Sequence, residues 1–158
     1  MATRGRISVE QQGDMLVISG SIDDTSGLLD LLVHARDRRL VLDLGGVTFI
    51  NSLGVRDWIR LQGAAQRGGV AVELHRVAEP LIQQMNMITA ARGGARVVSF
   101  FAPYACDACG REASLLIDAV THAQGLARLA PPAIDCAECG AAMVFNDFPE
   151  RYFSFLSV

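Results

Sequence analysis

The chain contains no lysine, and all 14 of its basic residues are arginine. A biased genomic base composition is the simplest explanation of this absence. No run of 18 apolar residues occurs, which excludes a transmembrane helix of ordinary length. The first ten residues lack the apolar stretch of a secretory signal peptide. These absences predict a cytoplasmic protein that makes no contact with a membrane.

The composition is that of a folded protein, because 51% of its 158 residues are hydrophobic. This length suits one domain with a small module attached. The charge is divided unevenly along the chain. Residues 1–104 carry 11 arginines against 10 acidic residues, whereas residues 105–158 carry 3 against 7. The second part is therefore acidic, and a composition change near Pro103 marks a predicted domain boundary.

Cysteine is absent before residue 106, and the four cysteines form two Cys-x-x-Cys-Gly knuckles: Cys106, Cys109, Cys136 and Cys139. Without an export signal, paired cysteines favour metal over disulfides. Two thiolates three residues apart can reach one ion across a tight turn, and the following glycine relieves backbone crowding. Four thiolates suit tetrahedral Zn²⁺ in a closed structural site. The pattern resembles a zinc ribbon, although the intervening segment 110–135 is longer than usual.

An iron–sulfur cluster and redox dithiols are the alternatives to this structural zinc. Catalytic zinc is disfavoured, because four protein ligands leave no position for water. Nucleic-acid binding is disfavoured as well, since the module lacks the basic surface that phosphate binding requires. We expect the metal to replace a core that so small a module cannot build. Residues 114–120 and 152–156 would pack the module onto the main domain or onto a second copy, as a homodimer.

Apolar periodicity predicts an α/β fold before this module. The expected order is β-β-α-β-α-β-α-β, a sheet with parallel βαβ units covered by helices. A Gly45-Gly46 turn is expected after residue 44, and Thr25 is expected to cap the first helix. The expected elements are strands 7–11, 15–20, 41–44, 70–74 and 95–101, and helices 25–36, 52–67 and 79–87.

Ser52 follows a second apolar burst, residues 47–50, and begins an amphipathic helix. A serine hydroxyl at this place can cap free backbone N–H groups. The same N–H groups and the helix dipole favour negative charge, so a phosphate on Ser52 would suit the position. Ser52 is therefore predicted either as a phosphorylation site or as a helix cap only.

The strand–turn–Asn-Ser-x-Gly–helix pattern over Val41–Val55 resembles the signature of STAS domains, the anti-anti-sigma factors. The resemblance covers residues 5–102; Gly20–Asp23 is similar to the family's turn beside the serine, and Asp43 to an acid on its strand. It implies a non-enzymatic antagonist that binds an anti-sigma factor with serine kinase activity and is released by phosphorylation of Ser52. Asn51 departs from the aspartate that is usual before the serine. The implied partner-binding residues are Asp23, Asn51, Leu53, Gly54 and Arg56.

The sequence therefore predicts a STAS-like domain over residues 1–102 and a zinc-ribbon-like module over residues 103–158. In the module a strand is expected over residues 142–145, after the second knuckle. The module is expected to end in a short helix capped by Asp147, with Glu150 three residues later. A regulatory antagonist is the first functional prediction. A scaffold or sensory adaptor assembled through its zinc module is the second, and a nucleic-acid-binding zinc ribbon is the third.

Overall fold

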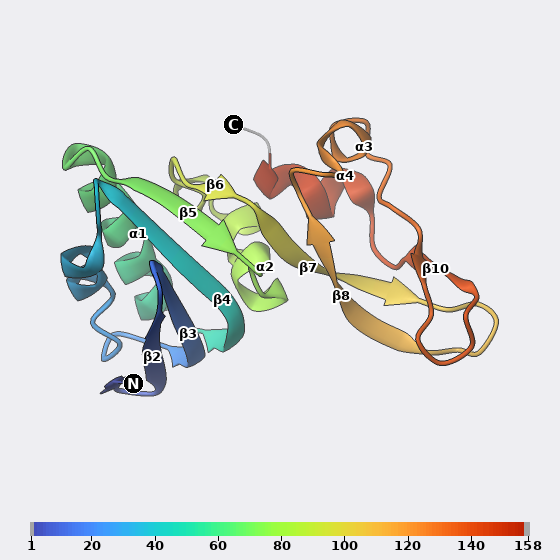
Figure 1. Cartoon of the computed structure of the whole chain (residues 1–158), viewed down its shortest axis with the longest axis horizontal. Coiled ribbons are helices and arrows are strands. Elements are labelled where there is room, and N and C mark those ends of the chain that lie inside the picture. The colour runs from blue at the N-terminus through green and yellow to red at the C-terminus, as the bar shows by residue number, and fades with distance from the viewer. Residues whose placement is uncertain (1, 157–158) are drawn as a thin grey trace.

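The computed structural model describes residues 2–156, which form two sheets joined at consecutive strands (Figure 1). The first sheet is mixed and has the order β1-β2-β3-β4-β5-β6. Its strands up to β3 pair antiparallel, and those from β3 onward pair parallel. The strands are β1 (Ala2–Arg4), β2 (Ile7–Gln12), β3 (Met15–Ile22), β4 (Arg39–Ile50), β5 (Ala71–His75) and β6 (Arg96–Val97). None of the helices over residues 2–156 is long and apolar enough to cross a membrane.

Helices cover one face of this sheet, as the apolar periodicity predicts. Helices α1 (Ser52–Arg67) and α2 (Glu79–Met87) have the predicted bounds. Figure 1 shows α1 behind β3 and β4. Alternate residues of β4, Leu40 to Leu44, are buried in the same hydrophobic cluster as Trp58, whose Nε1 donates to the Ala91 carbonyl at 2.8 Å. Ala91 ends a short 3-10 helix, η2 (Thr89–Ala91).

The predicted first helix is wrong in type and in start. Residues Leu28–His34 form a 3-10 helix, η1, that follows Gly27 with φ 63°. Thr25 does not cap it, because its hydroxyl and its N–H both bond Asp23 in the preceding turn. The left-handed glycine separates that turn from the helix, so seven residues remain for the helical segment. The N-terminal strand β1 was also not predicted.

The predicted turn at Gly45-Gly46 is wrong as well, because β4 continues through both glycines. The pairing of β3 with β4 shifts register between Val17 and Ser19, opposite this point. The Asp43 carboxylate accepts a hydrogen bond from the Gly45 N–H at 2.9 Å, which is typical of a local break in the ladder. A Cβ on Gly46 would lie 2.5 Å from the Ser19 Cβ. The glycines therefore allow a close approach of two strands.

Gly46→Ala should destabilise the first sheet by about 1–3 kcal/mol, because the added methyl group would overlap the rigid Cβ of Ser19. Urea denaturation followed by tryptophan fluorescence measures this change, since Trp58 lies in the same core. Gly94→Ala is the matched control, because nothing lies within 4 Å of the added carbon there. Equal stability of the two variants would contradict the close approach.

The second sheet is antiparallel and has the order β8-β7-β10-β9. The predicted strand 95–101 is divided, because β6 ends at Val97 and β7 begins at Ser99 in the other sheet. Strand β7 runs across the predicted domain boundary at residue 102. The predicted strand 142–145 is present as β10. The elements are β7 (Ser99–Ala105), β8 (Glu112–Asp118), α3 (Ala123–Ala127), β9 (Ile134–Asp135) and β10 (Ala142–Phe145).

The last described elements are α4 (Pro149–Tyr152) and the 3-10 helix η3 (Phe153–Leu156), which pack against α2. Asp147 does not cap α4, whose N-cap is Phe148; its carboxylate instead pairs with Arg151 at 2.6 Å. Asn86 of α2 donates to the Tyr152 carbonyl at 2.9 Å, and the Phe155 ring lies 5.1 Å from the Phe100 ring. One hydrophobic cluster thus includes both sheets and the tail.

Candidate metal centre and switch site

The two knuckles lie at the ends of two β-hairpins, one between β7 and β8 and the other between β9 and β10. In the first knuckle the Cys106 N–H donates to the Arg111 carbonyl, and the Gly110 N–H donates to the Cys106 carbonyl, both at 2.8 Å. The second knuckle repeats these bonds from Cys136 and Gly140 at 2.7 and 2.8 Å. Each turn therefore closes on its own backbone and presents two sulfurs on one side.

Glycine is required at the fifth position of each knuckle. Gly110 has φ 79° and Gly140 has φ 75°, a left-handed conformation that side chains with a Cβ rarely adopt. From the sequence alone, backbone crowding was the only reason for these glycines. Their positive φ angles give the physical reason for their presence after Cys109 and Cys139.

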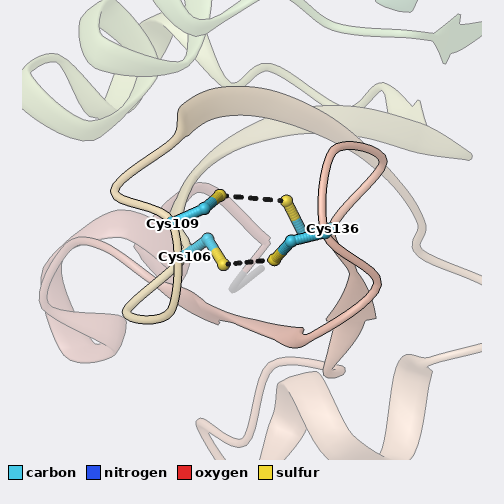
Figure 2. A group of neighbouring side chains, drawn as sticks. Cys106, Cys109 and Cys136 are labelled. Carbon is cyan, nitrogen blue, oxygen red and sulfur yellow. Dashed lines mark hydrogen bonds between the residues drawn. The ribbon is translucent and has the colours of Figure 1, made fainter.

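The four sulfurs converge to one point between the hairpins (Figure 2). The Sγ atoms lie within 4.8 Å of one another. The closest pairs join the knuckles, Cys106 to Cys139 at 3.5 Å and Cys109 to Cys136 at 3.7 Å. Tetrahedral zinc with bonds of about 2.3 Å requires sulfurs about 3.8 Å apart. Four thiolates at these separations fit one Zn²⁺ and complete its coordination.

The electrostatics of the cluster favour a cation. The N–H of Cys109, directed at the Cys106 sulfur, lowers the pKa of Cys106 to about 7, and the Cys139 N–H lowers the pKa of Cys136 in the same way. The Arg111 N–H also lowers the pKa of Cys109, but the neighbouring Cys106 sulfur and desolvation outweigh it and raise this pKa to about 12. The pKa of Cys139 is likewise raised. A divalent cation removes this repulsion between sulfurs, which is why metal binding releases protons.

An ion pair that the sequence did not indicate connects the knuckles. Arg111 Nη1 lies 2.9 Å from a Glu138 carboxylate oxygen. The two residues are 27 positions apart and share no periodic pattern. Because the carboxylate is largely exposed, the pair contributes about 0–1 kcal/mol. It supports the closed arrangement of the two turns without ligating the metal.

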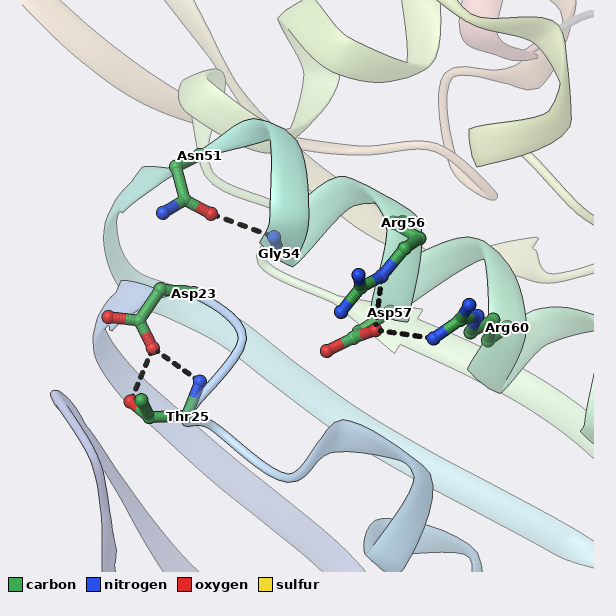
Figure 3. A network of polar contacts seen from close by, with 7 residues as sticks. All are labelled: Asp23, Thr25, Asn51, Gly54, Arg56, Asp57 and Arg60. Atoms are coloured by element: carbon green, nitrogen blue, oxygen red, sulfur yellow. Dashed lines mark hydrogen bonds and ion pairs between the residues drawn. The ribbon is translucent and has the colours of Figure 1, made fainter.

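The predicted switch residues gather at the carboxyl ends of β3 and β4. Ile22 and Ile50 pair in register, and the Asn51 N–H donates to the Ile22 carbonyl at 3.1 Å. This pairing places Asp23 beside Asn51, the residue that precedes Ser52 in the chain (Figure 3). The sheet thus brings together two segments that are about thirty residues apart in the chain.

Asn51, and not Ser52, caps helix α1. The Asn51 side-chain oxygen accepts a hydrogen bond from the Gly54 N–H at 2.8 Å, and its backbone is extended. Ser52 is the first helical residue and is exposed. The prediction of Ser52 as the cap is therefore wrong by one position. The cause is that β4 ends at Ile50, which pairs with Ile22 of β3. The next residue, Asn51, bonds the Ile22 carbonyl and stays extended, as a cap must be.

Asn51→Ala should lower the free energy of unfolding by about 1 kcal/mol, because the Gly54 N–H loses its acceptor. Asn51→Asp is the control, since aspartate can accept the same hydrogen bond and its charge favours the helix N-terminus. Thermal unfolding of the three proteins measures the difference. Equal melting temperatures for Asn51→Ala and the unsubstituted chain would contradict the cap.

Asp23 is engaged by its own turn. The Thr25 hydroxyl donates to its carboxylate at 2.5 Å and the Thr25 N–H donates at 2.9 Å. These bonds, together with Arg6 at 3.8 Å, hold the pKa of Asp23 below its ordinary value. The carboxylate therefore stays charged at neutral pH beside the start of α1.

The remaining predicted partner contacts differ in exposure. Leu53 is 42% exposed, and Arg56 is exposed and lies 3.0 Å from Asp57 (Figure 3). Gly54 is buried, and a Cβ at this position would lie only 2.6 Å from the Ile22 carbonyl oxygen. Its role is to let α1 approach β3.

Phe49 is an apolar surface residue that the sequence missed. It is 58% exposed and pairs in register with Ser21, two residues before Asp23. In the sequence, residues 47–50 are distinguished only as an apolar run. Val47 and Ile50 are buried whereas Thr48 and Phe49 are exposed, so alternation along the strand does not identify Phe49.

Comparisons with known proteins supply no relative. No family model matches the chain, and no curated protein matches it at a significant level.

Proposed function

We propose that the chain is a regulatory binding protein of the anti-sigma factor antagonist type, with Ser52 as its phosphorylation switch. Its first sheet with α1 and α2 would act as a STAS-like domain. The four cysteines would hold one structural Zn²⁺ in a zinc-ribbon-like module. The partner would be an anti-sigma factor that is also a serine kinase.

The position of Ser52 carries this proposal. The capping role belongs to Asn51, so Ser52 is not needed to cap α1 and remains exposed for modification. Exposed Leu53 follows it directly, and exposed Phe49 lies shortly before it on β4. A kinase could reach the serine, and a partner could cover the two apolar side chains around it.

Phosphorylation would act by charge. A phosphate adds about −1.5 to −2 charges at neutral pH. The N-terminus of α1 tolerates this charge in the free protein, because helix N-termini favour anions. An interface built on Leu53 would instead have to bury it near the Asp23 carboxylate. The modified chain therefore stays folded and loses its partner.

Asn51 changes the switch in a defined direction. An aspartate there would add a second negative charge next to the serine, whereas asparagine keeps the cap and removes that charge. Electrostatics alone would then ease the accommodation of the phosphate. Recognition by the kinase must rest on other groups, such as Asp23 and Arg56.

Incubation with ATP and a serine kinase of the anti-sigma factor type, sought among the genes adjacent to this chain's own, tests the proposal. We expect phosphate on Ser52, located by peptide mass spectrometry, and binding to the kinase that the phosphate abolishes. Ser52→Ala is the matched control and should bind without accepting phosphate. Absence of both phosphorylation and binding would reject the antagonist function and favour a constitutive scaffold.

A further inference from the structure

The four cysteines form two close pairs, and each pair connects the two knuckles. Cys106 and Cys139 are 33 residues apart in sequence with sulfurs 3.5 Å apart; Cys109 and Cys136 are 27 residues apart with sulfurs 3.7 Å apart. Each pair combines one buried cysteine, Cys106 or Cys136, with one exposed cysteine. Each pair therefore combines an accessible residue with a protected one.

The two exposed cysteines, Cys109 and Cys139, are the points where a small oxidant can enter. A metal-bound sulfur is held as a thiolate, and the thiolate is the nucleophilic form of cysteine. Oxidation of cysteine follows thiolate character and exposure. Cys109 and Cys139 combine both properties, and each has a second thiolate within reach to resolve the oxidised sulfur.

We propose that hydroperoxides convert this centre into two disulfides, Cys106–Cys139 and Cys109–Cys136, with release of the metal. The inference rests on the proposed zinc site. In each pair the exposed thiolate attacks one peroxide oxygen, the O–O bond breaks, and the other oxygen takes up a proton and leaves as water or an alcohol. The sulfur is now a sulfenic acid.

The buried thiolate completes the reaction in each pair. It attacks the sulfenic sulfur, forms the S–S bond and expels hydroxide, which takes up a proton to become water. The two sulfurs lose two electrons and the hydroperoxide gains them, so four cysteines consume two hydroperoxide molecules. Disulfide sulfurs no longer act as thiolate ligands, and the zinc ion leaves.

Cross-knuckle pairing has a structural consequence that pairing within a knuckle lacks. The two disulfides join the same hairpins that the metal joins, so the oxidised module stays closed without zinc. Disulfides within each Cys-x-x-Cys turn would put no covalent link between the hairpins, which would then be held by the pairing of β7 with β10 and by the Arg111–Glu138 pair. Oxidation would therefore store the module in a folded, metal-free form that reduction returns to the thiol state.

Because the chain has no lysine, trypsin cuts only after arginine and separates the two knuckles into different fragments. Trypsin cuts after Arg96, Arg111, Arg128 and Arg151, which places the first knuckle in fragment 97–111 and the second in fragment 129–151. The zinc-loaded chain is treated with two hydrogen peroxide molecules per chain, and released zinc is followed with a colorimetric chelator. We expect one zinc released per chain and the two fragments joined in one species that dithiothreitol separates.

Other results overturn the proposal. Two separate fragments, each two hydrogens lighter, would show pairing within the knuckles, and a fragment joined to its own copy would show pairing between chains. Retained zinc with reduced thiols would show that the centre resists hydroperoxides. A chain with no zinc before oxidation contradicts the zinc site itself and its release, while the fragment map still decides whether the disulfides join the two knuckles. The peroxide result is thus separable from the zinc content.

Discussion

Cys106→Ser is expected to remove the proposed structural zinc and to open the knuckle end of the second sheet, while the first sheet stays folded. Structural zinc binding in small modules is worth about 10–16 kcal/mol, so it exceeds the local stability of the knuckle ends of the two hairpins. Strand β9 has two residues and β10 has four. Without the metal, these strands have little else to hold their distal ends together.

Limited trypsin digestion measures this opening, because Arg111 lies directly after the first knuckle. Loss of only about 1.4 kcal/mol of local opening free energy raises the cleavage rate about tenfold, and we expect at least this increase at Arg111. The aromatic tail is expected to stay protected, since Tyr152, Phe153 and Phe155 are buried against α2 and β7.

The matched control is Asp107→Ser, which introduces the same side chain at an exposed position of the same knuckle without removing a ligand. It should keep one zinc per chain by elemental analysis and the original resistance to trypsin. A Cys106→Ser chain with unchanged zinc content and protease resistance would contradict a structural metal centre.

The elements that the sequence predicted best are those whose signals are local. The bounds of α1 and α2 followed from apolar spacing, from the polar Asn51-Ser52 start and from Gly68-Gly69 at the end of α1. The cysteine cluster was predictable for the same reason, since each knuckle is a turn of a few residues with its glycine in place.

The elements that the sequence missed depend on partners far away in the chain. Continuation of β4 through Gly45-Gly46 requires Ser19 on the neighbouring strand. The change of sheet between Val97 and Ser99 depends on which strand each segment pairs with. The apolar periodicity of a single segment does not show which strand it pairs with. The Gly45-Gly46 pair was therefore predicted to be a turn.

The start of α1, the proposed switch site, shows how a small geometric detail alters an inference from pattern. Asparagine and serine are equally good caps by propensity, so the pattern could not choose between Asn51 and Ser52. The choice is made by the end of β4, where Asn51 bonds Ile22 across the sheet and stays extended. Ser52 is thereby assigned to the helix and to the surface.

Ser52→Asp is expected to weaken binding to the partner kinase at least tenfold without unfolding the chain. The carboxylate places a permanent charge beside Leu53 and near Asp23, and burial of such a charge in an interface costs several kcal/mol. In the free protein the same charge lies in the first turn of α1, where it should raise stability by about 0.3–1 kcal/mol. Titration calorimetry and thermal unfolding measure the two effects.

The opposite signs of these effects separate a switch from a damaged fold. Gln12→Asp is the control, because it adds the same charge at an exposed residue of β2 that pairs with Met15, at the far end of β3 from Asp23. It should leave the affinity unchanged. If Ser52→Asp binds as tightly as Gln12→Asp, phosphate at Ser52 cannot be the signal that releases the partner, and the scaffold function is the one that fits the surface around α1.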